Sequence, residues 1–207
     1  MNWGDIMRKI PTLFKKQYAD GKFIGVSHEF NSDECRDAML YGVPTVKFDG
    51  SACAIINGNL YKRFDYRGKG ALPDGAIPCQ LLEDLPGHFP VWIPCKPKAG
   101  EDKWFFAAYY NTPVKLSDGS YEAIGKHFNG NFYNIDYDVL VKHGRYKIYG
   151  VELKTYEAIE QYLREHNIEG IVWWYGDKPV CKIRRKDFFI KWPDRQQEPM
   201  LYDILGK

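Results

Sequence analysis

The sequence predicts an α+β fold that is made mostly of antiparallel sheets and flanked by helices. Three observations lead to this class. Strand-like apolar runs outnumber helical segments along the chain. Several of these runs are separated by two-residue turn signals, which is the pattern of β-hairpins. Only two segments combine a helical apolar stripe with end caps.

The first expected helix covers residues 32–41. Ser32 suits the N-cap position, because its hydroxyl can accept a hydrogen bond from a free amide of the first turn. Asp33 and Glu34 follow within that turn, and Gly42 marks the expected end.

The second expected helix covers residues 155–166 and is the clearer of the two. Thr155 is its N-cap, and Glu157 and Glu160 lie early in the helix. One side is apolar and should face a core; it consists of Ala158, Ile159, Tyr162 and Leu163.

Strand-like runs follow the first helix. Residues 45–48 are expected to form a short strand. Residues 53–57 and 60–64 are expected to form a hairpin around the tight turn Gly58-Asn59.

Residues 65–103 are rich in Gly and Pro and are expected to be irregular surface structure. Four further strands are expected, the last two of them joined by Gly176-Asp177: 104–110, 139–141, 168–175 and 180–184.

The composition is that of an ordinary globular protein of 207 residues, and no repeat or linker divides it, so we expect one domain over residues 1–207. No apolar run reaches eighteen residues, which excludes a membrane-spanning helix. The first residues lack a signal-peptide pattern, which makes the cytoplasm the expected compartment. The five cysteines have no zinc-ligand spacing, which favours reduced, structural thiols.

The net charge is only +2, from 29 basic and 27 acidic residues, but the charge is unevenly spread. Residues 62–69 and 178–191 are basic. Such stretches are often simply solvated faces. Aromatic residues in or beside them favour a polyanion or a nucleotide instead: Phe64, Tyr66, Phe188, Phe189 and Trp192.

The run Lys47-Phe48-Asp49-Gly50 contains a candidate nucleophile. A lysine attacks phosphorus only as a neutral amine, so it needs burial or nearby positive charge. Lys47 ends an expected strand, and Gly50 would let the backbone approach a ligand closely. The pattern Lys-x-Asp-Gly alone occurs by chance in roughly one chain in twenty to thirty of this length. A surface turn is its alternative interpretation.

Four charged residues later in the chain strengthen the first interpretation, on segments otherwise suited to a core: Arg63, Glu122, Glu169 and Lys182. Singly, each is also explained as a solvent-facing residue of a strand. Together with Lys47, in this order, they are harder to explain in that way.

In these motifs the sequence resembles the covalent nucleotidyltransferase superfamily of ATP-dependent RNA and DNA ligases and mRNA capping enzymes. It is most similar to the compact 5′-to-3′ RNA ligases that include a vertebrate member, over about residues 25–193. The resemblance implies a nucleotidyltransferase (adenylylation) domain. Its most specific stretches are 44–50, 124–125, 129–131, 143–144, 168–173, Lys182 and Trp192-Pro193.

The resemblance further implies an RNA ligase that uses ATP and Mg²⁺ or Mn²⁺. Lys47 would attack the α-phosphorus of ATP, expel pyrophosphate and hold AMP. The AMP would then pass to a 5′-phosphate RNA end, and attack by a 3′-hydroxyl end would release it. RNA with these two ends is the implied partner, in RNA repair, and neither a membrane nor an obligate protein partner is implied.

Individual roles are carried over in the same way. Arg63 would contact the nucleotide sugar or the RNA 5′-phosphate, Glu122 would accept a ribose hydroxyl, and Glu169 would hold the metal. Lys182 would touch the α-phosphate and help to keep Lys47 neutral. The remaining expected nucleotide-binding residues are Val46, through its backbone at the adenine edge, Asp49, Gly50 and Arg184.

The sequence departs from the family pattern at several positions. Arg184 replaces the usual second lysine of the last motif, which keeps the charge but changes its geometry. Phe132 and Asp138 stand where relatives usually have proline and often have histidine. For stacking on adenine, Tyr137 and His143 are the nearby candidates, with a core or solvent-facing role as the alternative for each.

Two alternatives to an RNA ligase stay open. One is a nucleic-acid-binding protein that has the ligase fold without its chemistry. The other is a DNA ligase or a capping guanylyltransferase. These enzymes usually carry an oligonucleotide-binding barrel after the last lysine motif, and only 25 residues follow Lys182, so we expect a catalytic domain without that barrel.

Overall fold

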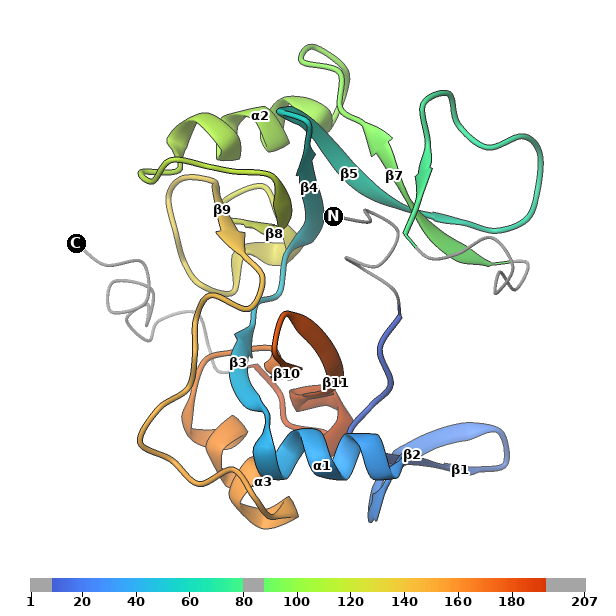
Figure 1. Ribbon diagram of the computed structural model, residues 1–207, viewed down its shortest axis with the longest axis vertical. Helices are drawn as coiled ribbons and strands as arrows, with labels where there is room; N and C mark the ends of the chain where they lie inside the picture. The colour runs from blue at the N-terminus through green and yellow to red at the C-terminus, as the bar shows by residue number, and fades with distance from the viewer. Residues whose placement is uncertain (1–8, 80–87, 193–207) are drawn as a thin grey trace. The chain divides into compact units, whose positions relative to one another are not determined.

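The computed structural model describes residues 9–79 and 88–192. The first eight residues and Pro193 of the expected motif lie outside this part. The chain forms two units (Figure 1): unit 1 comprises Met1–Lys9 and Gly50–His143, and unit 2 comprises Ile10–Asp49 and Gly144–Lys207. The backbone therefore passes from unit 2 to unit 1 after Asp49 and returns after His143.

Unit 2 contains an antiparallel sheet in the order β11-β10-β3, which confirms the strands expected at 45–48, 168–175 and 180–184. A hairpin, β1–β2, forms a second sheet that was not expected. The elements are β1 (Phe14–Ala19), β2 (Lys22–Phe30), α1 (Asp33–Tyr41), β3 (Val43–Lys47), α3 (Tyr156–Glu165), β10 (Gly170–Tyr175), β11 (Lys178–Arg184) and the 3₁₀ helix η4 (Arg185–Phe188).

One face of the β11-β10-β3 sheet is buried under α1 and α3. Ile171 and Ile183, which are directly paired, are both fully buried in this core. Ala38 of α1 and Ile159 of α3 pack in the same cluster. Each fully buried isoleucine contributes about 1.5–3 kcal/mol of hydrophobic stabilisation. Because side chains alternate along a strand, the neighbours of these residues point to the opposite face.

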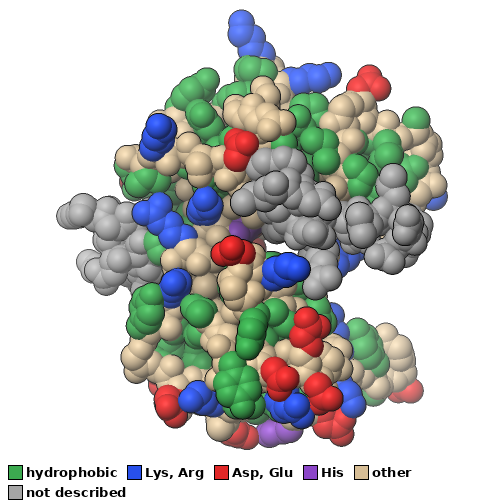
Figure 2. Space-filling view, in the orientation of Figure 1, with side chains coloured by type: hydrophobic (Ala, Val, Ile, Leu, Met, Phe, Trp, Pro, Cys, Tyr) green, Lys and Arg blue, Asp and Glu red, His purple; other side chains and the backbone are tan. Residues whose placement is uncertain are grey.

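Both expected helices of unit 2 are confirmed, with their caps. The Ser32 hydroxyl accepts the Cys35 N–H at 3.2 Å, and the Thr155 hydroxyl accepts the Ala158 N–H at 3.1 Å. In the lower part of Figure 2, over α1 and α3, acidic and basic side chains are intermingled. Ion pairs between neighbours account for part of this pattern: Arg36–Asp33, Arg36–Asp37 and Arg164–Glu160.

Unit 1 contains a six-stranded antiparallel sheet in the order β6-β7-β5-β4-β8-β9. Its last strand confirms the one expected at 139–141. The elements are β4 (Ser51–Ile56), β5 (Asn59–Tyr66), β6 (Ile77–Pro78), β7 (Phe89–Pro94), α2 (Asp102–Asn111), β8 (Gly119–Ile124), the 3₁₀ helix η3 (Asn129–Asn131) and β9 (Val139–Lys142).

Each face of the six-stranded sheet carries its own apolar cluster. Helix α2 covers one face, where its Phe105 and Ala108 pack with Tyr121 and Leu140. The other face carries a smaller cluster, the Trp92 cluster, which consists of Ala54, Ile56, Cys79 and Trp92 with Ala52, Tyr61 and Ile77 beside it.

The prediction of a strand at 104–110 was wrong, because these residues lie in α2. The run is rich in aromatic residues, which by themselves favour strands. In the fold, however, Phe105 and Ala108 are three residues apart and share the helix side that packs on the sheet. The burial of that side outweighs the weak local preference.

The expected hairpin forms, but its turn lies one residue earlier than predicted. Ile56 pairs with Asn59, so the turn residues are Asn57 and Gly58. Both have positive φ, +50° and +74°, which is the conformation that a type I′ turn requires and that Asn-Gly adopts most readily.

The expectation of irregular structure over 65–103 was wrong in part, since β7 pairs with β5 along its length. Val91 and Trp92 of β7 are fully buried. The prolines that suggested a loop, Pro90 and Pro94, lie near the ends of this strand, where a missing N–H costs little.

Within the described residues, no helix is long and apolar enough to cross a membrane. All five cysteines are free, and only Cys95 is not fully buried.

Candidate active-site residues

In unit 2, three of the expected site residues lie on the face of the sheet opposite its apolar core. Lys47 and Arg184 are each paired with Gly170, and Lys182 is paired with Val172. Directly paired residues share a face, and residues two apart on a strand do so too. The three basic side chains therefore project from one face.

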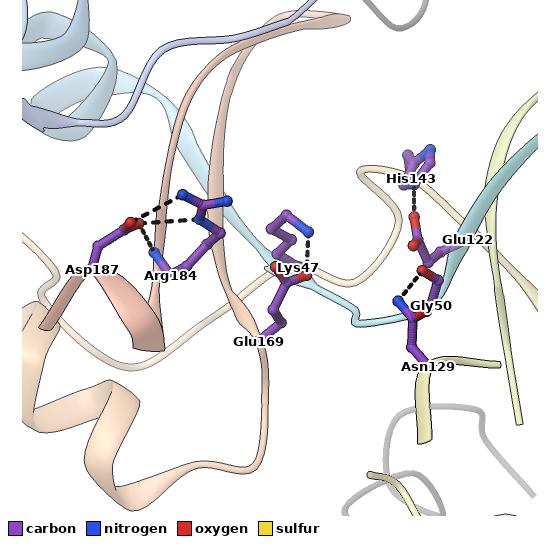
Figure 3. A network of polar contacts seen from close by, with 8 residues as sticks. All are labelled: Lys47, Gly50, Glu122, Asn129, His143, Glu169, Arg184 and Asp187. Atoms are coloured by element: carbon purple, nitrogen blue, oxygen red, sulfur yellow. Dashed lines mark hydrogen bonds and ion pairs between the residues drawn. The ribbon is translucent and has the colours of Figure 1, made fainter. Parts of the chain in front are cut away.

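Lys47 contacts Glu169, which directly precedes β10. The Lys47 carbonyl accepts the Glu169 N–H at 3.2 Å, and Lys47 Nζ donates to Glu169 Oε2. Figure 3 shows the two side chains pointing toward one another. The side chains are 24% and 19% exposed, so the pair is only partly shielded from water.

Gly170 allows the close backbone contact beside this pair. A Cβ at Gly170 would lie 2.1 Å from the Ile183 carbonyl oxygen and 2.9 Å from Arg184 Cα. Any side chain would force the strands apart, so glycine is required here for steric reasons.

Arg184 is held by Asp187, a residue that we did not single out from the sequence (Figure 3). Its Nε and terminal nitrogen donate to the two carboxylate oxygens at 3.2 and 3.0 Å, and its backbone N–H donates at 2.9 Å. Asp187 is 1% exposed. The three-residue spacing of a capping box was the available signal for this partner. Arg184 thus has a structural partner besides any ligand.

Val46 faces the apolar core, and its N–H donates to the Tyr146 carbonyl at 2.8 Å. This amide is therefore already used within the protein. Asp49 is the last residue of the first segment of unit 2 and is partly buried.

In unit 1, Arg63 and Glu122 lie on the same face of the six-stranded sheet, the face of the Trp92 cluster. Glu122 is paired with Ala52, and Arg63 is paired with Trp92. Ala52 and Trp92 both belong to this cluster. Arg63 binds Asp65 at 3.1 Å, two residues along β5.

Glu122 is 8% exposed and is held by a histidine. His143 Nε2 lies 2.9 Å from Glu122 Oε2, as Figure 3 shows, and His143 Nδ1 lies 3.0 Å from the Ser120 hydroxyl. Both edges of the His143 ring are therefore engaged in polar contacts.

Gly50, the last residue of the Lys47 motif and the first of the Gly50–His143 segment of unit 1, packs against β8. A Cβ there would lie 2.2 Å from the Ala123 carbonyl oxygen. Asn129 Nδ2 donates to the Gly50 carbonyl (Figure 3). The glycine of the motif is thus explained by close backbone packing.

The two remaining departures from the family pattern, Asp138 and Phe132, and the stacking candidate Tyr137 differ in their surroundings. Asp138 is 3% exposed and holds His127, accepting its N–H at 3.0 Å and contacting Nδ1 at 2.7 Å. The His127 ring stacks on Trp104 with a centroid distance of 3.4 Å. Tyr137 is 45% exposed. Phe132 is partly buried.

Over residues 9–79 and 88–192, no three His, Cys, Asp or Glu side chains come together as a metal site. A partly exposed single carboxylate such as Glu169 nevertheless suits Mg²⁺, which is usually bound by one or two carboxylates plus waters and substrate phosphates. The donor set present therefore fits a metal that arrives with a nucleotide.

Comparison with known proteins points to RNA ligases. A family model described as RNA ligase 1 matches residues 109–202. RNA ligase 1 of Rattus norvegicus is 23% identical over 272 aligned positions, which cover 92% of this chain and 83% of the relative. RNA ligase 1 of Mus musculus has the same identity and coverage. RNA ligase 1 of Danio rerio is 28% identical over 143 positions, covering 54% of this chain and 44% of the relative.

Proposed function

We propose that this chain, whose similarities support an RNA ligase family, is an ATP-dependent RNA ligase that joins a 5′-phosphate end to a 3′-hydroxyl end. The whole chain would act as one nucleotidyltransferase domain in this proposal. The observation that carries it is the shared sheet face of Lys47, Lys182 and Arg184, with the Glu169 carboxylate on Lys47 Nζ.

The first step would form a bond between Lys47 Nζ and the α-phosphorus of ATP. The bond from the α-phosphorus to the bridging oxygen breaks, pyrophosphate leaves, and the amine loses its proton. Before this attack Nζ must leave Glu169 Oε2, because an ammonium that donates to a carboxylate has no free electron pair. Lys182, on the same face, would place positive charge at the α-phosphate and oppose the charged form of Lys47.

The second and third steps would use the stored AMP. An oxygen of the RNA 5′-phosphate attacks the α-phosphorus, and the bond to Lys47 Nζ breaks. The 3′-hydroxyl oxygen then attacks the activated 5′-phosphate, and AMP leaves. Such displacements depend on in-line positioning and charge neutralisation.

Other residues would bind and orient the substrates. Glu169 would hold Mg²⁺ or Mn²⁺, which when bound supplies positive charge to phosphate oxygens. In unit 1, Arg63 would contact the nucleotide sugar or the RNA 5′-phosphate, and Glu122 would accept a ribose hydroxyl. Arg184, Asp49 and Gly50 would complete nucleotide binding, with the Val46 carbonyl at the adenine edge.

Incubation with ATP labelled at the α-phosphate, in the presence of Mg²⁺, tests the proposal. We expect label on the wild type and none on Lys47→Arg, which can keep the charge beside Glu169 but is not a nucleophile. Lys16→Ala, an exposed lysine of β1, should label like the wild type. Absence of label on the wild type, or equal label on Lys47→Arg, would favour a ligase-fold binding protein without catalysis. End-joining assays on matched RNA and DNA then separate an RNA ligase from a DNA ligase.

A further inference from the structure

Ser120, Glu122 and His143 form a polar chain on one face of the unit 1 sheet. Ser120 and Glu122 are two residues apart on β8, so their side chains share a face. His143 directly follows β9, and its N–H donates to the Ser120 carbonyl at 3.1 Å. Ser120 and Glu122 are 7% and 8% exposed, so neither is a solvated surface group.

The direction of each hydrogen bond in this chain follows from its chemistry. An ionised carboxylate only accepts, so His143 Nε2 must donate to Glu122. In a neutral imidazole the other nitrogen, Nδ1, is then the acceptor. The Ser120 hydroxyl, 3.0 Å away, is a suitable donor to it. The Glu122 carboxylate therefore sets the tautomer of His143, and the Ser120 hydroxyl, which can donate or accept, is compatible with it.

One carboxylate oxygen is occupied and the other is not. Glu122 Oε2 receives the His143 bond, whereas Oε1 has no hydrogen-bond partner among the residues that the structure describes. Oε1 is not among the fully buried side-chain atoms that lack a partner, so it keeps some access to solvent, and a ligand hydroxyl could donate to it. The His143 bond fixes the plane of the carboxylate and so the direction in which Oε1 points.

We propose that His143 is a positioning residue that aims Glu122 at a ribose hydroxyl and thereby sets the preference for a ribonucleotide over a deoxyribonucleotide. The proposal rests on the proposed function, which places a nucleoside triphosphate against Glu122. It assigns His143 a role through its ring edge. A stacking role would use the ring face instead. The two roles therefore differ in which substitutions of His143 they would tolerate.

Three substitutions of His143 separate these roles. His143→Gln can place an amide N–H near the position of Nε2, and so keeps the donor to Glu122. His143→Asn has the same chemistry but is too short to reach Glu122. His143→Phe keeps a ring face for stacking but has no donor. The readout is the rate of self-labelling, measured as kcat and KM with ATP, 2′-deoxy-ATP and 3′-deoxy-ATP.

We expect His143→Asn and His143→Phe to raise the KM for ATP about tenfold, with kcat within about threefold of wild type. The KM for the deoxynucleotide that lacks the contacted hydroxyl should barely change. The preference of the enzyme for ATP over that deoxynucleotide should therefore be largely lost. His143→Gln should retain most of the discrimination. His28→Ala, which removes an exposed histidine of β2, should match the wild type throughout.

The proposal is overturned if Gln, Asn and Phe at this position behave alike, or if Phe alone keeps wild-type discrimination. It is also overturned if the loss is in kcat with the discrimination unchanged. Should the wild type itself take no label, the proposed function fails and the role of His143 falls with it. If instead the wild type is labelled and the substitutions of His143 leave the discrimination unchanged, only the proposal for His143 fails.

Discussion

Lys47 and Arg184 stand in one row of the unit 2 sheet, each directly opposite Gly170. No side chain projects between them, because the middle position of the row is the glycine. Two basic groups can therefore face the same ligand from neighbouring positions of a rigid sheet. A side chain at position 170 would push the strands apart, so the same glycine supports both the stability of the sheet and the placement of Lys47 and Arg184.

Gly170→Ala tests whether the row is needed. The added Cβ would meet the Ile183 carbonyl oxygen at 2.1 Å, so the strands must shift, at about 1–3 kcal/mol. A shift of this kind misplaces Lys47, and we expect self-labelling to fall by about a hundredfold at temperatures where the variant is folded. Gly21→Ala, with φ of +74° and open space around it, should lose stability but not labelling rate. Equal labelling by both variants would contradict the prediction.

Glu169→Gln tests the carboxylate beside Lys47. The ion pair is partly exposed, so its loss should change the free energy of unfolding by less than about 1 kcal/mol. The amide is a poor metal ligand, and we expect the Mg²⁺ concentration for half-maximal labelling to rise at least about tenfold. Labelling across a Mg²⁺ titration measures this, with the exposed Glu157→Gln as control. An unchanged Mg²⁺ dependence would remove Glu169 from metal binding.

Arg184→Lys tests the structural part of the Arg184 role. Lysine cannot make the two-point contact with Asp187, whose carboxylate is 1% exposed and would lose a partner. We expect a loss of about 1–3 kcal/mol in urea unfolding. Arg36→Lys, on the surface of α1, should lose less than about 1 kcal/mol. If both variants unfold alike, the Asp187 contact does not stabilise the fold.

The stability of the protein should depend on pH through Cys79. Burial raises the pKa of its thiol from 9.0 to about 12, although Arg63 opposes the shift. Since the folded pKa exceeds the unfolded one, the contribution is complete below about pH 9 and is lost as the pH rises toward 12. It amounts to at most about 4 kcal/mol.

Cys79→Ala removes this titration while leaving other groups in place. Urea unfolding of both proteins between pH 8 and 11 should show the wild type losing stability more steeply than the variant. The gap between the two should thus narrow as the pH rises. Parallel curves would show that the Cys79 thiol does not titrate differently in the folded and unfolded states.

The sequence by itself determined the elements that depend on near neighbours. The caps Ser32 and Thr155 select their helices because each hydroxyl reaches an amide only three residues away. The hairpin of β10 and β11 follows from two apolar runs around Gly176-Asp177. Alternation along those runs also places Lys182 away from the core. The charged motif residues could likewise be recognised without a structure, and so could the similarity to RNA ligases that rests on them.

Only the tertiary structure decided the features that depend on distant partners. Residues 104–110 became helical because Phe105 and Ala108 bury one helix side against a sheet. Arg184 gained Asp187 as a partner through the 3₁₀ turn that follows β11. Glu122 was set by His143, 21 residues away, because β8 and β9 pair in one particular register. Such contacts are selected by the packing of the whole unit, and no local pattern encodes them.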